Sequence, residues 1–309
     1  MSAKPAQRQT AQKAAQEQAL PQLEKRIREL ALPTRLADGR ELSVLSFYFV
    51  QDLARTLGRS RSTIPGRPRG QNVALVERAA LKLGVLPERY LRNHDTYSLG
   101  EQLSLLSSRA ALVGLGGLGG YVLELLARAG VGHIRAADGD EFVASNLNRQ
   151  LYATRRSLGG YKAAAAAARL KQVNPAVDFE PVAKFLDEAD MGRFISGAQL
   201  CLDALGGLKD RAALARQAAQ AGIPLLTAAV AGQSGLVALV LPGQKCPSDF
   251  FGAGAGAEDS QGTPAPAVAT AASIMAGEAV NILCGREPRL AGKMLVFDLA
   301  QMSFETVAL

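Results

Sequence analysis

A glycine-rich segment, GLGGLGG at Gly114–Gly120, separates a short apolar stretch from a longer stretch rich in leucine and alanine. Glycines at such a turn expose backbone N–H groups and let a ligand approach the backbone closely. If a helix begins there, its dipole favours the negative charge of a phosphate. The segment therefore predicts a nucleotide site, and the alternative is a tight turn that packs a strand on a helix without a ligand.

Charged residues beyond this loop indicate which kind of nucleotide the site would bind. Asp138 lies about 20 residues after the loop, where an acidic residue binds ribose hydroxyls in dinucleotide-binding proteins. A dehydrogenase would be the default interpretation, but a polar run from Ser145 to Gln150 follows, with Asp140 before it and Lys162 after it. Arg149 and Lys162 together suit the triphosphate of ATP, because both can neutralise phosphate oxygens.

The surrounding pattern alternates apolar strands with helices, which predicts a mostly parallel sheet covered on both faces. Three later strands should extend the sheet in antiparallel fashion, and 250–266 should be a long loop. The expected parallel strands are Arg109–Val113, Ile134–Ala137, Leu200–Asp203 and Pro224–Ala228, and the later strands are Leu236–Leu241, Met294–Asp298 and Ser303–Ala308. The expected helices are Leu118–Ala129, Lys162–Val173, Asp210–Ala221 and Val268–Cys284.

The N-terminal part differs in charge. Residues 1–70 contain 13 Lys and Arg against 6 Asp and Glu, whereas the rest of the chain is balanced. This excess indicates either attraction to nucleic acid or an acidic partner, or a solvated leader. Helices are expected at Leu42–Leu57 and Val73–Leu83. We therefore divide the chain into a basic, helical or partly disordered region, 1–88, and a nucleotide-binding domain, 89–309.

Cysteine and apolar content indicate a cytoplasmic protein. None of the three cysteines forms a CxxC pair, which argues against disulfides and structural zinc. The N-terminus lacks the apolar core of a secretory signal, and no long uncharged apolar stretch predicts a membrane span. We expect Cys246 to be an exposed thiol and Cys201 and Cys284 to lie in the core. His94 and His133 are interpreted as structural.

From about Arg89 onward, an ordered series of motifs resembles the ThiF/MoeB/HesA family, relatives of ubiquitin-activating enzymes. The motifs are VGLGGLGG, AGVGHIRAADGDEFVASNLNRQLY, LGGYKA and VNP. The resemblance implies a Rossmann-like α/β fold, here with an antiparallel C-terminal extension and a helical N-terminal appendage. It also implies a homodimer that uses ATP and Mg²⁺ to adenylate the C-terminal glycine of a small ubiquitin-fold sulfur carrier ending in Gly-Gly.

The resemblance also assigns residues. Asp138 matches the ribose ligand, Asn146 and Arg149 match phosphate-contacting residues, and Lys162 matches a phosphate-binding lysine. Arg92, in RYLRN at 89–93, is similar to an arginine that enters the partner subunit's ATP site. The residues expected to contact nucleotide are Gly114, Gly116, Gly117, Gly119, Asp138, Asp140, Ser145, Asn146, Asn148, Arg149, Lys162 and Gly206. The residues expected to carry catalysis are Arg149, Lys162, Arg92 and Asp203.

Two departures from the family pattern leave alternatives open. Gly206 and Gly207 follow Asp203 where the family usually has D-x-x-D-N, so a metal-binding carboxylate is missing. Asp203, Asp140 or Asp210 then supports Mg²⁺, or ATP turnover is poor, or the protein is a non-catalytic binding protein. The family's zinc cysteines are also absent, so no zinc is expected and a persulfide step is doubtful. A cyclase that adenylates a carboxylate on a tRNA adenosine, with tRNA as partner, is the second enzyme alternative.

Overall fold

The structure is a computed structural model that describes residues 20–59, 69–207, 210–249 and 257–309. The chain forms two compact units. One contains residues 1–106 with 175–178, and the other contains 107–174 with 179–309. The expected behaviour of residues 1–19 and of the first part of the 250–266 loop lies outside the described residues.

The first unit combines helices with a small sheet that the sequence pattern did not predict. Its strands run in the order β1-β2-β3, with β1 antiparallel to β2 and β2 parallel to β3. Residues 20–30 are also helical. The elements are β1 (Leu32–Arg35), β2 (Glu41–Leu45), α2 (Phe47–Arg59), α3 (Arg69–Lys82), β3 (Leu86–Pro87), the 3-10 helix η1 (Glu88–Asn93) and α4 (Leu99–Ser107).

The expectation of one helix over Leu42–Leu57 was wrong. Glu41–Leu45 is a strand and α2 begins only at Phe47. Ser46 separates the two, and its hydroxyl accepts a hydrogen bond from the Phe49 amide at 3.3 Å, as a helix-capping side chain does. The apolar residues before Ser46 pair with β1 instead of continuing the helix, so tertiary pairing overrode the local pattern. The second helix was predicted correctly, since α3 covers the expected region.

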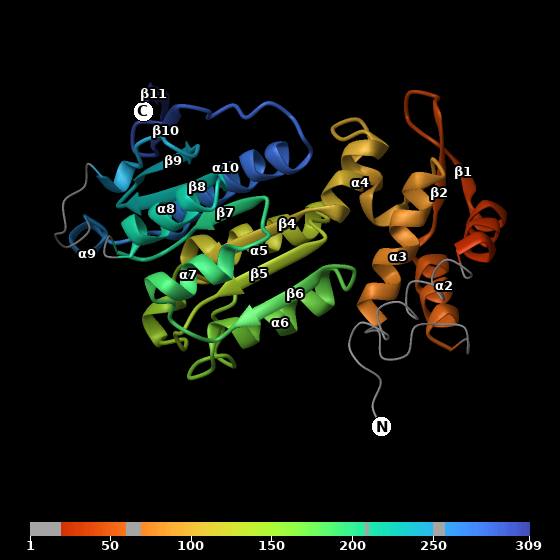
Figure 1. The fold of residues 1–309 in the computed structure, drawn as a ribbon, viewed down its shortest axis with the longest axis horizontal. Helices are drawn as coiled ribbons and strands as arrows, with labels where there is room; N and C mark the ends of the chain where they lie inside the picture. Colours follow the sequence, from red (N-terminus) through yellow and green to blue (C-terminus); the bar gives the residue numbers. More distant parts are fainter. Residues whose placement is uncertain (1–19, 60–68, 208–209, 250–256) are drawn as a thin grey trace. The chain divides into compact units, whose positions relative to one another are not determined.

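The second unit is built on a sheet of eight strands in the order β11-β10-β9-β8-β7-β4-β5-β6 (Figure 1). β4 pairs in parallel with β5 and β7, and β7 pairs in parallel with β8. The β8–β9, β9–β10 and β10–β11 pairs are antiparallel. The strands are β4 (Arg109–Val113), β5 (His133–Ala137), β6 (Asp178–Val182), β7 (Leu200–Asp203), β8 (Leu225–Ala231), β9 (Ser234–Val240), β10 (Lys293–Asp298) and β11 (Ser303–Ala308).

Helices cover both faces of this sheet, as the alternating pattern predicted. α10 packs against α5 and against β8 and β9, and α5 contacts α6. On the opposite face, α7 packs with α8 over a core that includes Met191, Phe194 and Leu214. The elements are α5 (Gly117–Ala129), the 3-10 helix η2 (Ala144–Asn146), α6 (Lys162–Val173), α7 (Glu188–Ile195), α8 (Arg211–Gln220), the 3-10 helix η3 (Pro247–Asp249), α9 (Ala257–Gln261) and α10 (Ala265–Leu283).

The fold class predicted from the sequence is confirmed, and most strands and helices lie where they were expected. β6 and α7 were missed. The predicted long loop is also shorter than expected, because α9 and the start of α10 occupy part of 250–266.

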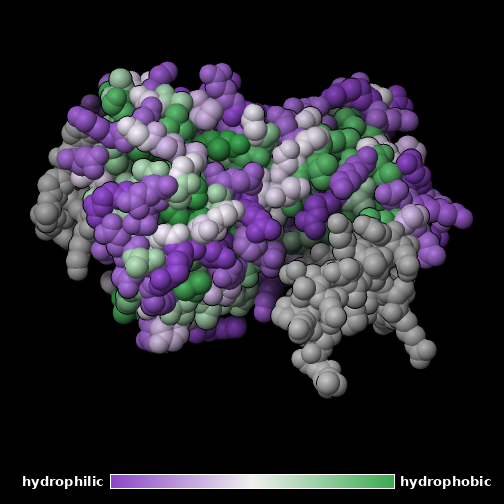
Figure 2. Space-filling model, in the orientation of Figure 1, coloured by the Kyte–Doolittle hydropathy of each residue, from purple (hydrophilic) through white to green (hydrophobic). Residues whose placement is uncertain are grey.

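α10 is the one described helix that is long and apolar enough to cross a membrane, by length and composition only. It packs on α5 and the sheet, and 56% of its most apolar window is buried within the protein. On the face of the molecule drawn in Figure 2, hydrophobic patches are interrupted by hydrophilic ones. The position of α10 is therefore that of a core helix.

The order of the strands indicates which edge of the sheet in the second unit can bind a ligand. From β4 the chain crosses to β5 on one side, whereas β7 pairs on the other side of β4. In open parallel sheets, ligands bind where such crossovers diverge, beyond the carboxyl ends of the strands. The glycine-rich loop after β4 and the turn after β7 both lie at this edge.

Candidate functional site

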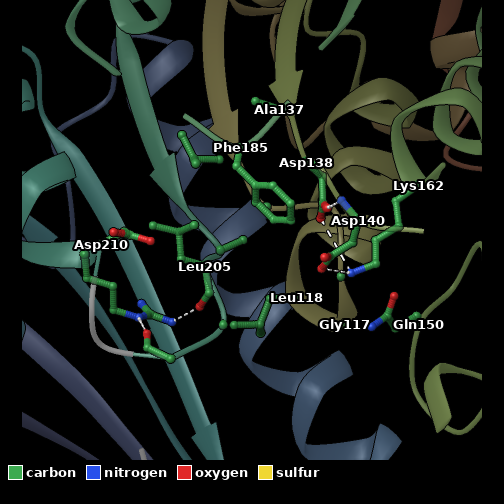
Figure 3. A pocket seen from close by; sticks show the side chains of 18 of the residues that line it. Gly117, Leu118, Ala137, Asp138, Asp140, Gln150, Lys162, Phe185, Leu205 and Asp210 are labelled. Atoms are coloured by element: carbon green, nitrogen blue, oxygen red, sulfur yellow. Dashed lines mark hydrogen bonds and ion pairs between the residues drawn. The ribbon is translucent and has the colours of Figure 1, made fainter. Parts of the chain in front are cut away.

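A cavity of about 520 Å³ opens at this edge of the sheet (Figure 3). Its size is within the range of small-molecule sites. Its walls come from the loops that follow β4, β5, β6 and β7, together with the starts of α5, α6, α8 and α10. Among the lining residues are Gly114, Gly116, Gly117, Asp138, Asp140, Asn146, Arg149, Gln150, Lys162, Lys184, Phe185, Leu205, Gly206, Gly207, Asp210, Arg211 and Val268.

The glycine-rich loop forms the floor of the cavity, and two of its positions require glycine. Gly114 has φ 98°, and a Cβ there would lie 2.3 Å from the carbonyl oxygen of Ala204. A Cβ on Gly119 would lie 1.9 Å from the carbonyl oxygen of Gly114. α5 begins at Gly117, after Gly116, with no side chain capping its first amides. These N–H groups are therefore left for an anion in the cavity.

Asp138 lies immediately after β5 and is fastened to the glycine-rich loop. Its Oδ2 accepts a hydrogen bond from the Leu115 amide at 2.7 Å, and its Oδ1 accepts one from the Asp140 amide at 2.8 Å. Burial raises the pKa of this carboxyl above its ordinary value, while the positive charge of Lys162 acts in the opposite direction. Asp138 lines the cavity at the position expected for a ribose ligand.

Lys162 is the first residue of α6, and its side chain is 7% exposed. Its Nζ lies 2.8 Å from Oδ2 of Asp140 and 3.8 Å from Oδ2 of Asp138 (Figure 3). The three side chains form a charged cluster on one wall of the cavity. An ammonium group held by carboxylates at the edge of a cavity can exchange one of these contacts for a phosphate oxygen.

Arg149 lies beside the glycine-rich loop. Its Nη1 donates to the carbonyl oxygen of Ser145 at 3.0 Å and to Oδ1 of Asn148 at 2.8 Å. Its Cγ would lie 3.6 Å from a Cβ built on Gly117. The structure thus brings Arg149, Lys162 and the glycine-rich loop to one cavity.

The polar run that contains Arg149 divides into lining and supporting residues. Asn146 lines the cavity and accepts a hydrogen bond from the Val143 amide at 3.0 Å. Ser145 and Asn148 do not line it and instead support Arg149. Gly119 likewise shapes the turn without lining the cavity.

Asp203 does not lie at the cavity wall, where the sequence pattern predicted it. Its side chain is fully buried, and its Oδ2 lies 2.8 Å from Nη1 of Arg211 and 2.7 Å from Oγ1 of Thr227. Its Oδ1 accepts a hydrogen bond from the Leu205 amide at 3.1 Å. The expectation that Asp203 binds Mg²⁺ or takes part in catalysis is corrected here, because this carboxylate faces Arg211 and not the cavity.

The turn after β7 is open toward the cavity. A Cβ on Gly206 or Gly207 would meet no atom within 4 Å. Asp210 also lines the cavity, and its carboxylate does not cap α8. No cluster of three or more His, Cys, Asp or Glu side chains that could hold a metal occurs in the part of the chain that the structure describes. Asp140 and Asp210 are carboxylates at the cavity wall that could contribute to a Mg²⁺ site, because that ion takes one or two protein carboxylates and otherwise phosphate and water oxygens.

Arg92 lies in η1 of the first unit and does not line the cavity of its own chain. η1 is anchored by Glu77, whose carboxylate accepts hydrogen bonds from Arg89 and Tyr90, each at 3.1 Å. An action of Arg92 in a partner subunit stays a prediction.

Cys246 is 4% exposed, so the expectation of an exposed thiol was wrong. It packs with the core under α7 and α8, and burial raises the pKa of its thiol. Cys201 and Cys284 are buried, as expected.

The histidines occupy the structural positions predicted for them. His94 Nδ1 lies 2.6 Å from the Leu91 carbonyl oxygen, and its Nε2 lies 3.1 Å from Asp95. His133 lies in β5, 4.0 Å from Glu180.

Sequence reasoning missed the wall formed after β6. Lys184, Phe185 and Leu186 line the cavity there, and the Phe185 ring packs against the backbone of Gly139. Phe185 and Leu186 give this wall an apolar surface of the kind that lines small-molecule sites. It could have been found only by identifying β6, since parallel strands bring the loops at their carboxyl ends to one edge of the sheet.

Comparisons with known proteins give a family and relatives that cover most of the second unit. The model of the ThiF family matches residues 90–309. The molybdopterin-synthase adenylyltransferase of Escherichia coli K12 is 31% identical over 213 residues, covering 67% of this chain and 86% of the relative. The sulfur carrier protein ThiS adenylyltransferase of E. coli K12 is 29% identical over 220 residues, covering 70% of this chain and 87% of the relative.

Two further comparisons cover different parts of the chain. The tRNA threonylcarbamoyladenosine dehydratase of E. coli K12 is 35% identical over 122 residues, which cover 39% of this chain and 46% of the relative. A structure of E. coli MccB with ATP shares the fold, with a TM-score of 0.63 and 17% identity over 90% of this chain and 95% of MccB. The fold similarity thus extends into the first unit, whereas the family match begins at residue 90.

Proposed function

The chain belongs to the ThiF family, and from this premise we propose that it adenylates the C-terminal glycine of a small ubiquitin-fold sulfur carrier, with ATP as the second substrate. Relatives that match most of the second unit are adenylyltransferases, which supports the reaction class. The carrier's C-terminal Gly-Gly and its pathway belong to the proposal.

One observation carries this proposal. The glycine-rich loop, Asp138, Arg149 and Lys162 line a single cavity, although more than forty residues separate the first glycine from the lysine. Uncapped amides of α5 and two cations suit a polyphosphate, Asp138 suits the ribose, and Phe185 offers an apolar wall for the base. Together these groups offer a contact for each part of ATP, which supports the proposal.

The reaction needs charge neutralisation more than proton transfer. A carboxylate oxygen of the carrier attacks the α-phosphorus, a new oxygen–phosphorus bond forms, and the bond to the β-phosphate oxygen breaks to release pyrophosphate. The carrier's C-terminus is already ionised at neutral pH, so no general base is required. Because both reactants are anions, Arg149, Lys162 and the α5 amides would hold them together and stabilise the transition-state charge.

Mg²⁺ would supply further positive charge at the phosphates when bound with ATP. Asp140 and Asp210 are the carboxylates that would hold it, because both line the cavity, whereas Asp138 is bound to two backbone amides and is assigned to the ribose. Asp140 shares its oxygen with Lys162, whereas Asp210 stands beside the open turn at Gly206 and Gly207. Asp210 is therefore the stronger candidate for the missing family carboxylate.

The proposed setting is a cytoplasmic homodimer. The resemblance to the family supports it, since Arg92 would then reach the partner subunit's cavity. Anchoring of η1 through Glu77 would give that arginine a fixed base.

A non-catalytic carrier-binding protein is the second candidate, and the glycines at 206 and 207 favour it because they remove a metal-binding carboxylate. The tRNA-directed cyclase is the third. Its relative matches a much shorter part of the chain, which makes it the weaker enzyme alternative.

ATP–pyrophosphate exchange tests the proposal. We expect exchange only when a carrier ending in Gly-Gly is present. Lys162→Ala or Arg149→Ala should lower the exchange rate at least about a hundredfold, because each variant removes a cation that stabilises the transition state. Calorimetry of ATP binding separates the other outcomes. Exchange that requires tRNA would favour the cyclase, and carrier binding without ATP binding would favour the non-catalytic protein.

A further inference from the structure

The Gln150 carboxamide is a buried polar group without a full set of partners. The residue is 7% exposed, and its Oε1 has no hydrogen-bond partner among the described residues. Buried polar atoms are nearly always paired, because an unpaired one loses its hydrogen bonds to water without replacement. An exception at the wall of a cavity indicates a partner that arrives with a ligand.

Its location points to the phosphate end of the site. Gln150 lines the cavity, and its Nε2 would lie 3.6 Å from a Cβ built on Gly116, the residue before the first turn of α5 (Figure 3). The backbone of Gln150 is fixed, since its amide donates to the Asn146 carbonyl oxygen at 2.9 Å and its own carbonyl accepts from Ala153 at 3.0 Å. The backbone thus places the side chain beside the start of α5.

The neighbouring polar side chains of the cavity already have partners within the protein. Lys162 is paired with Asp140, Arg149 donates to Asn148, and Asn146 accepts from a backbone amide. Gln150 differs from them in keeping an unused acceptor. A carboxamide also carries a donor and no charge, so it can contact an anion without repelling it.

We propose that Gln150 is a nucleotide-contacting residue whose carboxamide turns when ATP binds, so that Nε2 donates to a phosphate oxygen and the buried Oε1 gains a hydrogen bond from a water molecule of the hydrated nucleotide. The inference rests on the proposed function and adds a residue to its site. Oε1 is therefore unpaired in the protein without nucleotide and gains a partner only when ATP binds.

If Gln150 has this role, substituting it should change the affinity for ATP without changing the stability of the protein. Gln150→Leu has a similar shape and removes the unpaired acceptor, so the unliganded protein should lose no stability. ATP should bind about tenfold more weakly, because one hydrogen bond to a charged group is lost. Gln150→Glu should weaken ATP binding more than Gln150→Leu does, since it places an anion beside the phosphates.

The experiment measures the dissociation constant of Mg-ATP by calorimetry and the unfolding temperature without nucleotide, on the full chain and each variant. Gln51→Leu in α2 is the matched control, because Gln51 also has a buried unpaired amide atom, Nε2, but does not line the cavity. The control should bind ATP as tightly as the parent protein.

Four results would overturn the inference. ATP binding by Gln150→Leu and Gln150→Glu at the parent's affinity would remove the contact. Equal weakening by the Gln51 control, or a loss of affinity that accompanies a lowered unfolding temperature in both Gln150 variants, would make the effect one of packing. Failure of the parent protein itself to bind ATP would instead refute the proposed function, and the inference with it.

Discussion

The two sides of the cavity use acidic residues differently. On the side of the glycine-rich loop, Asp138 and Asp140 hold Lys162 at the cavity wall. On the side of the β7–α8 turn, Asp203 forms a buried ion pair with Arg211 and leaves the wall to Gly206 and Gly207. The first side therefore presents its aspartates at the cavity wall together with a cation. The second side buries Asp203 in an ion pair that holds the turn and leaves Asp210 as the aspartate at the wall.

The difference shows that moving an aspartate by one position at the end of a strand changes the environment of its side chain. Asp138 follows the last residue of β5 and turns toward the loop. Asp203 is the last residue of β7, paired in the sheet with Val113 on one side and Thr227 on the other. Since successive side chains of a strand point to opposite faces, a shift of one position sends an aspartate to a different environment.

Arg211→Leu tests the structural side and has the largest expected effect. The variant leaves the Asp203 carboxylate buried without its cation, which should cost about 3–5 kcal/mol of unfolding free energy. Urea unfolding followed by circular dichroism measures it. Arg216→Ala is the control, because Arg216 pairs with Glu188 at the surface, where solvent screens the pair and its loss should change the unfolding free energy little.

A second variant sharpens that test. Adding Asp203→Asn to Arg211→Leu removes the isolated charge and should recover part of the lost stability. If the double variant is as unstable as Arg211→Leu alone, the buried charge is not what the arginine compensates, and the contrast between the two sides fails.

Gly114→Ala and Gly206→Ala compare the glycines of the two sides. Gly114 has a positive φ and lacks space for a Cβ, so alanine should cost at least about 2 kcal/mol and displace the Ala204 carbonyl. Gly206 is open, and alanine there should change stability by about 0.5 kcal/mol or less. Thermal unfolding measures both, and equal losses would contradict the steric distinction.

Asp138 gives the smallest effect, as a dependence on pH. Its pKa is raised in the folded protein from an ordinary value of 3.8, so the folded state binds this proton more tightly than the unfolded chain does. The stabilising contribution is present below pH 3.8 and is lost as the pH rises through the raised pKa.

The measurement compares urea unfolding free energies of the parent and Asp138→Asn without nucleotide, from about pH 4 upward. The parent's stability relative to the variant should decline with rising pH and then level off, because the other titrations cancel in the difference. A difference that stays constant or grows would show that burial does not dominate the environment of Asp138.

Much of the second unit could be predicted because its signals are local. The bounds of β4, β7 and α6 follow from short apolar runs and from Lys162 at a helix start. β6 carries the sequence DFEPV, with only two half-buried positions among exposed ones, so it has little apolar signal of its own. Missing this strand also hid Phe185 and its neighbours.

In the first unit the local signal misled. Leu42, Val44 and Leu45 carry apolar side chains that suit a helix face as well as a strand, and only pairing with β1 and β3 selects the strand. The basic charge of residues 1–70 was evident from composition, but it gave no indication of the three-stranded sheet.

The sequence by itself determined the glycine turn, the Asp138 position and the two cations, because each follows from residue type and spacing along a strand–loop–helix unit. Only the tertiary structure decided that Asp203 and Cys246 are buried and that Gln150 keeps an unpaired oxygen. The physical reason is that burial and pairing depend on which distant segments meet. Arg211 and Thr227 reach Asp203 through the order of the strands, and local sequence carries no record of that order.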